Sequence, residues 1–209
     1  MSKEIFVDYG EYNLQRLGEL ISLAAGKYRS EAYARLLADR YGSFENILAA
    51  PADELRRIVG EEVASLLKLT AMLLSQKAIE SFTLGVDHTT VEIADYLKKR
   101  FLGESVEIVL ALPLDSAGRI LECREVARGT INSSSIFTRD LAEAAINAGS
   151  KRLAIAHNHP LGMAKVSNED ATMTGGLAEQ LMRVGITLEC HYIIAGMECE
   201  IVNSEFADN

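Results

Sequence analysis

The residues best suited to chemistry lie in one short stretch, Ala156-His157-Asn158-His159-Pro160. The chain has only four histidines, and two of them, His157 and His159, are separated by a single residue here. In extended backbone, side chains two residues apart project to the same side, so the two imidazoles could bind one ion. Asp170, in the first turn of an expected helix, could add a carboxylate oxygen. Three protein ligands and an open fourth position for water are typical of a catalytic zinc site.

Hydrolysis at such a site needs more than the metal ligands. Zinc lowers the pKa of a bound water to about 7, but passing the proton to a leaving amine requires an acid/base, usually a carboxylate. Glu107 is the candidate, because it lies near the start of an otherwise apolar run, where an ionisable group is costly to bury without a partner. Glu122 and Glu125 compete for the same role. Ser167 could donate a hydrogen bond to the oxyanion formed during attack.

Each of these residues also has a plainer explanation. Ser167-x-x-Asp170 fits a helix N-terminus, with Ser167 as the capping residue and Asp170 at the third helical position. His191 could lie beside the metal ligands or be an ordinary core histidine. The combination of H-x-H-P with a following S-x-x-D favours the metal site, because the two motifs rarely occur together by chance.

The elements that must position these residues form the C-terminal half of the chain. Apolar runs bounded by turn residues predict two β-hairpins and a single strand, and helical periodicity predicts two helices, the first capped by Thr138. This half is therefore expected to be a mixed α/β domain with its unusual residues at strand and helix ends. In chain order, the expected elements span residues 106–114, 119–128, 139–147, 152–157, 167–184, 186–195 and 199–202.

The N-terminal half shows only helical periodicity. Ser30 and Ser43 are expected to cap helices, and a longer helix is expected at 61–82. Short helices joined by a glycine turn suggest a helix-hairpin-helix, whose turn amides bind a DNA phosphate, but Glu61 and Glu62 after the turn would repel one. A linker near residue 85 would separate an all-α domain, 1–85, from the second domain, 86–209.

Composition and charge limit the classes of function. The chain has 209 residues, 48% of them hydrophobic, which is enough for a packed core. The net charge of −9 arises from 10 basic and 12 acidic residues up to Gly85 and 11 and 18 after it, which disfavours DNA as a partner. No apolar run is long enough to cross a bilayer and no signal peptide is recognisable, so we expect a cytoplasmic protein without a membrane partner. Three widely spaced cysteines suit a reducing compartment.

The motif also resembles that of a known superfamily. His157-Asn158-His159-Pro160, Gly162 and Ser167-x-x-Asp170 are similar to the JAMM motif, H-x-H-x(7)-S-x-x-D, of the JAB/MPN metalloproteases, and H-N-H-P-x-G points to the RadC branch. The similarity covers roughly residues 104 to 203 and extends more weakly into the N-terminal helices. Beyond the motif, it includes the strand at 107–115, the G-T-x-N-x-S segment at 129–134, Arg139-Asp140 and the late strand at 191–196.

The resemblance implies an α+β fold, in which a small, degenerate helix-hairpin-helix-like domain precedes a mixed α/β MPN/JAB domain of the cytidine-deaminase-like kind. It implies Zn²⁺ bound by His157, His159 and Asp170, with Ser167 supporting the oxyanion and Glu107 acting as the acid/base. The activity implied is cleavage of an amide or peptide (isopeptide-like) bond in a peptide or protein substrate. The alternative is a non-catalytic DNA-associated or scaffolding role, as the DNA-repair name of the family suggests.

Two features depart from the family pattern. The loop at 161–167 lacks two prolines and an acidic residue, which puts the substrate range in doubt. His191-Tyr192 stands where the family has Asp-His, which removes a carboxylate that could support a metal ligand. Neither the substrate nor the oligomeric state follows from the sequence.

Overall fold

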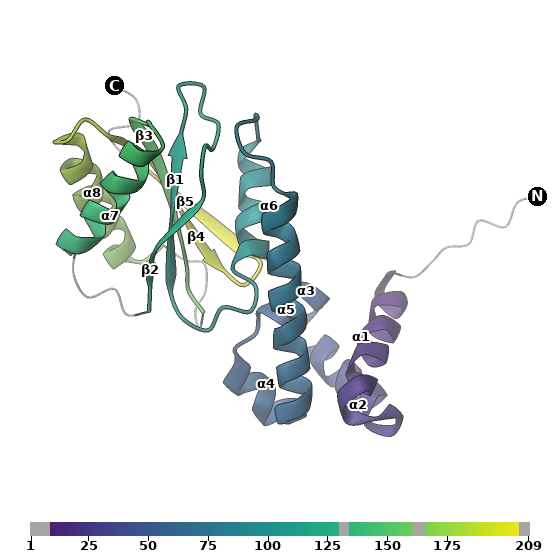
Figure 1. Cartoon of the computed structure of the whole chain (residues 1–209). Coiled ribbons are helices and arrows are strands. Elements are labelled where there is room, and N and C mark those ends of the chain that lie inside the picture. The colour runs from purple at the N-terminus through teal and green to yellow at the C-terminus, as the bar shows by residue number, and fades with distance from the viewer. Residues whose placement is uncertain (1–8, 130–133, 161–165, 205–209) are drawn as a thin grey trace, which may run out of the picture. The chain divides into compact units, whose positions relative to one another are not determined.

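The computed structural model describes residues 9–129, 134–160 and 166–204 of the chain (Figure 1). The chain divides into two compact units, one ending at Leu73 and the other beginning at Leu74. The division falls inside the long helix α5 (Glu61–Ser81). The last part of this helix belongs to the second unit, within which Ser75 Oγ donates a hydrogen bond to the Arg100 carbonyl at 2.7 Å. The domain boundary expected near residue 85 stays a prediction.

The first unit is helical, as its periodicity predicts. Four buried leucines from successive helices, Leu37, Leu48, Leu55 and Leu67, are each fully enclosed. Gly42 and Gly60 follow the ends of two helices with positive φ angles of 79° and 84°, which glycine adopts without a side-chain clash. The helices are α1 (Tyr9–Ala25), α2 (Lys27–Tyr41), α3 (Phe44–Ala49), α4 (Ala52–Val59) and the first part of α5.

One of the two expected caps in this unit is wrong. Ser43 does cap α3, because its side chain accepts a hydrogen bond from the Asn46 amide at 3.1 Å. Ser30, however, lies inside α2, which begins directly after Gly26. Its hydroxyl donates to the Lys27 carbonyl at 2.9 Å and so has no role at the helix N-terminus.

The second unit is built on one mixed five-stranded sheet. The strand order is β2-β1-β3-β4-β5, with β3 and β4 parallel and every other neighbouring pair antiparallel. Figure 1 shows α7 and α8 on one face of this sheet and α6 on the other. The strands are β1 (Ile108–Leu114), β2 (Arg124–Arg128), β3 (Arg152–Asn158), β4 (Thr187–Ala195) and β5 (Glu198–Asn203), and the helices are α6 (Thr90–Arg100), α7 (Ser134–Asn147) and α8 (Asn168–Met182).

Strand alternation gives the sheet a separate apolar core on each face. On the α6 side, Leu110, Leu112 and Ala156 of the strands pack with Leu97 and Phe101. On the α7 and α8 side, the intervening strand residues Val109, Ala111 and Ile155 pack with apolar residues of both helices. These helix residues are Leu141 and Ala144 of α7 and Leu177 and Leu181 of α8. His157 follows Ala156 and pairs with Val109, so it belongs to the α7 and α8 face.

Most expected elements of this unit are confirmed, and two boundaries differ. Thr138 does not cap α7, which begins at Ser134; the Thr138 hydroxyl instead donates to Gln180 of α8 at 2.9 Å. The second strand of the first hairpin is shorter than expected, because only Ile120 bridges back to Leu114 before regular pairing starts at Arg124. Within the described residues, no helix combines the length and the apolarity that a membrane span requires.

Candidate metal centre

Three side chains of the sequence motif converge where β3 ends and α8 begins. His157 Nε2 lies 3.2 Å and His159 Nε2 lies 3.7 Å from Asp170 Oδ1. The two Nε2 atoms are 2.7 Å apart. Around a tetrahedral zinc with bonds of about 2.0–2.2 Å, ligand atoms lie roughly 3.3–3.6 Å from one another. The two distances to Asp170 are close to this range, whereas the two Nε2 atoms lie closer together than it; the three residues thus form a compact group of ligand atoms that could hold one metal ion.

Asp170 is both a helix cap and a candidate ligand, because its two carboxylate oxygens face different partners. Oδ2 accepts hydrogen bonds from the Ser167 amide at 2.9 Å and the Ser167 hydroxyl at 2.6 Å. Ser167 Oγ in turn accepts from the Asp170 amide at 3.0 Å, which completes a capping box. Oδ1 is left to face the two imidazoles. The cap thus orients the candidate ligand.

Backbone pairing fixes the two histidines. His157 lies within β3 and pairs with Val109 of β1 on one side and Ile193 of β4 on the other. His159 lies just past the strand end, where its amide donates to the Ile194 carbonyl at 2.7 Å. The side chain of His157 is 5% exposed and that of His159 is 20% exposed. The cluster therefore reaches solvent on the His159 side.

The protonation states of this cluster suit a cation. Burial, assisted by the neighbouring His159, lowers the pKa of His157 to about 4, so its imidazole is neutral at neutral pH. Burial also opposes ionisation of Asp170, but the hydrogen bonds from the Ser167 hydroxyl and amide outweigh it and lower the Asp170 pKa. The neutral His157 imidazole, the His159 imidazole and one carboxylate are side chains of the types that zinc accepts.

His191 lies directly behind His157, which settles the choice left open by the sequence. It is fully buried, and its Nε2 lies 2.6 Å from His157 Nδ1. On its other side, His191 Nδ1 lies 2.7 Å from the hydroxyl of Thr174, a residue that the sequence reasoning missed. Burial lowers the pKa of His191 to about 3. Thr174 is four residues after Asp170 on α8, and this helical spacing was the available signal.

Glu107 lies immediately before β1, on the same face of the sheet as His157. Continuing the register of Val109 with His157 by two residues places position 107 opposite His159. By strand alternation, Glu107 shares the face of Val109. Its carboxylate is exposed, and its carbonyl accepts from the Gly129 amide at 2.7 Å. Glu107 thus lies outside β1 and does not interrupt it, in contrast to the expectation from the apolar run, and because it is exposed it needs no buried partner. Its acid/base role stays a prediction.

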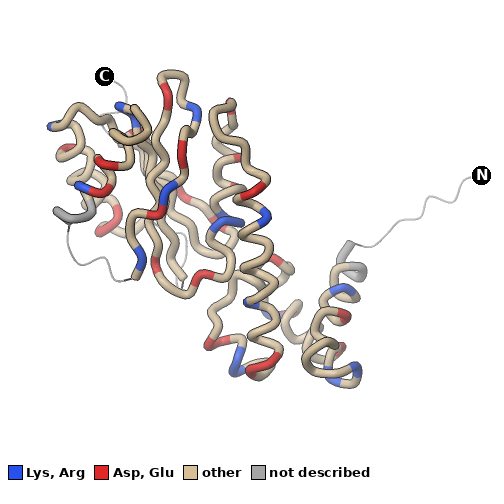
Figure 2. The backbone as a smooth tube through the Cα atoms, viewed as in Figure 1, with Lys and Arg blue, Asp and Glu red and all other residues tan. Residues whose placement is uncertain are grey.

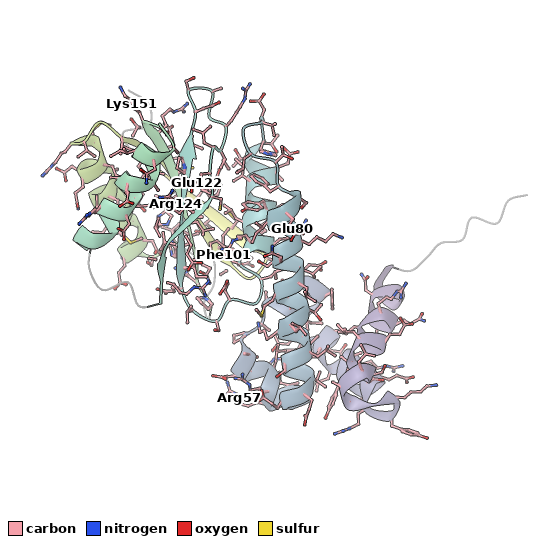
Figure 3. The ribbon with its side chains drawn as sticks, in the orientation of Figure 1. Arg57, Glu80, Phe101, Glu122, Arg124 and Lys151 are labelled. Atoms are coloured by element: carbon pink, nitrogen blue, oxygen red, sulfur yellow. The ribbon has the colours of Figure 1, made fainter. Side chains whose placement is uncertain are left out.

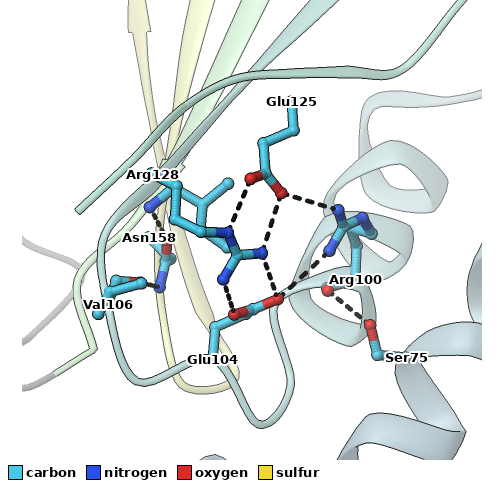
Figure 4. A network of polar contacts seen from close by, with 8 residues as sticks. Ser75, Arg100, Glu104, Val106, Glu125, Arg128 and Asn158 are labelled. Atoms are coloured by element: carbon cyan, nitrogen blue, oxygen red, sulfur yellow. Dashed lines mark hydrogen bonds and ion pairs between the residues drawn. The ribbon is translucent and has the colours of Figure 1, made fainter.

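Asn158 holds the backbone on both sides of Glu107. Its Oδ1 accepts from the Ile108 amide at 2.7 Å, and its Nδ2 donates to the Val106 carbonyl at 3.0 Å (Figure 4). The Asn158 amide thus continues the pairing of β1 with β3 beyond the end of the regular ladder. Asn158 is 4% exposed, so water cannot replace these bonds easily.

We expect Asn158→Ala to lower the free energy of unfolding by about 1–3 kcal/mol, because it leaves the buried Ile108 amide and the part-buried Val106 carbonyl without their Asn158 partner. The measurement is urea unfolding of the full chain. Asn203→Ala is the matched control, because Asn203 is exposed on β5, and it should change stability by less than about 0.5 kcal/mol. Equal unfolding midpoints for the two variants would contradict the role of Asn158.

The two competing glutamates lie elsewhere. Glu125 pairs with Leu110 and therefore lies on the α6 face, where Arg128 contacts it at 2.7 Å and Arg100 at 3.7 Å (Figure 4). The hydrogen bond from Arg128 holds the Glu125 pKa below its usual range. Glu122 forms an ion pair with Arg124 at 2.9 Å; Figure 3 labels both residues. Glu122 lies just before β2, near the end of β1 that is farther from His157. Neither carboxylate is placed to serve the cluster.

Ser167 uses its hydroxyl proton within the cap, because its Oγ donates to Asp170 Oδ2. An oxyanion-supporting role would require that proton to turn away from Asp170, and this role stays a prediction. The residue before it is also held, since Glu200 of β5 accepts from the Val166 amide at 2.8 Å. The loop at 161–165 and most of the segment at 129–134, both compared with the family from sequence, lie outside the described residues.

Basic and acidic side chains are intermixed on the described residues (Figure 2). Figure 2 shows Lys and Arg interspersed with Asp and Glu along the elements of both units. Many of these basic side chains are paired with carboxylates, as Arg128 is with Glu104 at 2.8 Å and Arg119 with Asp87 at 2.8 Å. The alternative DNA-associated or scaffolding role stays a prediction.

The mixed sheet, the helices on both of its faces and the His-His-Asp cluster at the end of β3 define a JAB-type α/β domain with a candidate metal centre. The sequence profile of the RadC-like JAB domain matches residues 88–204. The chain is 30% identical over 167 residues to a UPF0758 protein of Neisseria meningitidis, which covers 77% of this chain and 73% of the relative. A UPF0758 protein of Shewanella baltica is 30% identical over 168 residues, 79% of this chain and 75% of the relative. The chain belongs to the RadC-like JAB domain family.

Proposed function

We propose that this chain is a zinc-dependent hydrolase that cleaves an amide or peptide bond. The observation that carries the proposal is the convergence of His157, His159 and Asp170 at one solvent-reaching corner of a RadC-like JAB domain. Two imidazoles and a carboxylate would leave one position of a tetrahedral shell for a non-protein ligand. That open position separates a catalytic arrangement from a purely structural one.

Zinc bound by these residues would supply Lewis acidity, lowering the pKa of water to about 7 and polarising a scissile carbonyl. His157 is the buried, fixed ligand, and His159 is the ligand at the solvent-reaching side. Asp170 presents Oδ1 to both histidines while Ser167 holds Oδ2. The protein residues therefore fix the ligand geometry before a substrate arrives.

Glu107 is the proposed acid/base. If it follows the alternation of β1, its exposed side chain shares the face of His157, and in this proposal its carboxylate would take a proton from the attacking water and return it to the leaving amine nitrogen. Asn158 fixes the backbone on either side of Glu107 and so limits its movement. In this proposal the substrate is a peptide or protein with an accessible amide or isopeptide-like bond. The hydroxyl of Ser167 could support the oxyanion if it released Asp170.

The test combines metal content with turnover of the full chain. Protein purified without added metal should contain about one equivalent of zinc or gain melting temperature when zinc is added. Against a panel of peptide and isopeptide-linked substrates followed by mass spectrometry, Glu107→Gln should keep the zinc and lose about 10²–10⁴-fold in turnover. Glu122→Gln is the matched control and should keep both. Absence of zinc without any stabilisation by added zinc, or full activity of Glu107→Gln, would refute the proposal.

A further inference from the structure

A chain of three buried contacts runs from α8 to the back of His157. The Thr174 hydroxyl donates to the Asp170 carbonyl at 2.7 Å, and the same hydroxyl oxygen lies 2.7 Å from His191 Nδ1. His191 Nε2 then lies 2.6 Å from His157 Nδ1. Thr174, His191 and His157 are 2%, 0% and 4% exposed, so water does not compete for these bonds.

The direction of every proton in this chain follows from its first contact. A carbonyl oxygen only accepts, so the single Thr174 proton is used on Asp170. The Thr174 oxygen must then accept from His191 Nδ1. Because a neutral imidazole carries one N–H, His191 Nε2 is an acceptor and His157 Nδ1 must be the donor. His157 Nε2, the atom that faces His159 and Asp170, is therefore left without a proton.

We propose that Thr174 and His191 are positioning residues that hold His157 in the Nδ1–H tautomer, the only neutral form whose Nε2 can bind a metal. The inference rests on the proposed metal site. It gives a physical role to the histidine that stands where the family pattern has an aspartate. A carboxylate there would accept from His157 without help, whereas an imidazole can donate or accept, and Thr174 makes it an acceptor.

The geometry also links two ligands of the site. The Thr174 hydroxyl bonds to the backbone carbonyl of Asp170, one helical turn earlier, while its oxygen receives the chain that ends at His157. The Thr174 side chain therefore contacts both the helix that carries Asp170 and His191, the imidazole hydrogen-bonded to His157. Replacing Thr174 by valine keeps its branched shape and removes both contacts.

The experiment uses Thr174→Val with two matched variants of the full chain. Thr174→Ser keeps the hydroxyl. Thr172→Val removes the same kind of bond, from Thr172 Oγ1 to the Asn168 carbonyl at 2.7 Å, at an exposed position of the same helix. Zinc affinity measured by chelator competition should fall about 10–100-fold in Thr174→Val, as for loss of a group that orients a ligand histidine. Thr174→Ser and Thr172→Val should stay near wild type.

A second readout does not depend on zinc. In the zinc-free wild type, long-range ¹H–¹⁵N NMR spectra should show His157 with its proton on Nδ1, and Thr174→Val should shift it toward Nε2–H. A proton on Nε2 in the wild type, or unchanged zinc affinity in Thr174→Val, would overturn the inference. A wild type that binds no zinc would refute the proposed metal site instead. The NMR spectra would still show whether the His157 proton lies on Nδ1, as the hydrogen-bond chain requires, or on Nε2.

Discussion

Asp170→Ala is expected to weaken zinc binding by far more than Ser167→Ala, although both variants destroy the same helix cap. Asp170 Oδ1 faces the histidines and would bind the metal itself, whereas Ser167 only holds the other oxygen, Oδ2. Loss of a supporting partner typically costs 10–100-fold in metal affinity, and we expect loss of the ligand to exceed about 100-fold. The measurement is zinc affinity by chelator competition.

The cap gives this comparison its internal control. Without zinc, each variant removes the reciprocal bonds of the capping box, so each should lower the free energy of unfolding by about 1 kcal/mol. Equal loss of stability with unequal loss of zinc affinity would separate the ligand role of Asp170 from its capping role. If Ser167→Ala loses as much zinc affinity as Asp170→Ala, Asp170 is only a structural acid.

The candidate ligands could be predicted from sequence because their geometry is local. His157 and His159 share one side of a strand end, and Asp170 lies three residues after a serine that caps the next helix. These short spacings determine the direction in which each side chain projects, without knowledge of the fold. What the sequence could not give is that capping and metal binding are compatible, since this depends on which carboxylate oxygen faces which partner.

The supporting residues were harder to predict, because their contacts cross long separations in sequence. Asn158 contacts residues 50 and 52 positions earlier, and His191 contacts His157 across 34 positions. Such contacts require the register of β1, β3 and β4, which periodicity does not fix. The same register removed Glu125 as a competitor, because it pairs with Leu110 and lies on the opposite face.

Element types were predicted better than element starts. Ser30 and Thr138 have the residue type of a cap, yet both lie inside helices that begin at Lys27 and Ser134, and their hydroxyls donate to the Lys27 carbonyl and the Gln180 side chain. Residue type alone therefore does not locate the start of a helix. By contrast, Thr89 and Glu92 form a complete capping box at the start of α6, a pairing that their three-residue spacing allows.

The second large effect is expected at Leu112, in the core on the α6 side of the sheet. Leu112 is fully buried, and its neighbours include other strand residues of that face. Leu112→Ala should lower the free energy of unfolding by about 2–5 kcal/mol, through lost transfer energy and the cavity that remains. Urea unfolding of the full chain measures it. Ile146→Ala is the control, because Ile146 is 65% exposed on α7.

The same variant tests whether the two faces of the sheet act separately. Leu112 lies on the opposite face from His157, in a cluster of apolar residues that includes none of the three candidate ligands. Under conditions where Leu112→Ala remains folded, its zinc affinity should therefore stay within about twofold of wild type, because distant sites without shared partners act additively. A large loss of zinc affinity in the folded variant would mean that strand position, transmitted through β1 and β3, controls the ligand geometry more strongly than the local hydrogen bonds do.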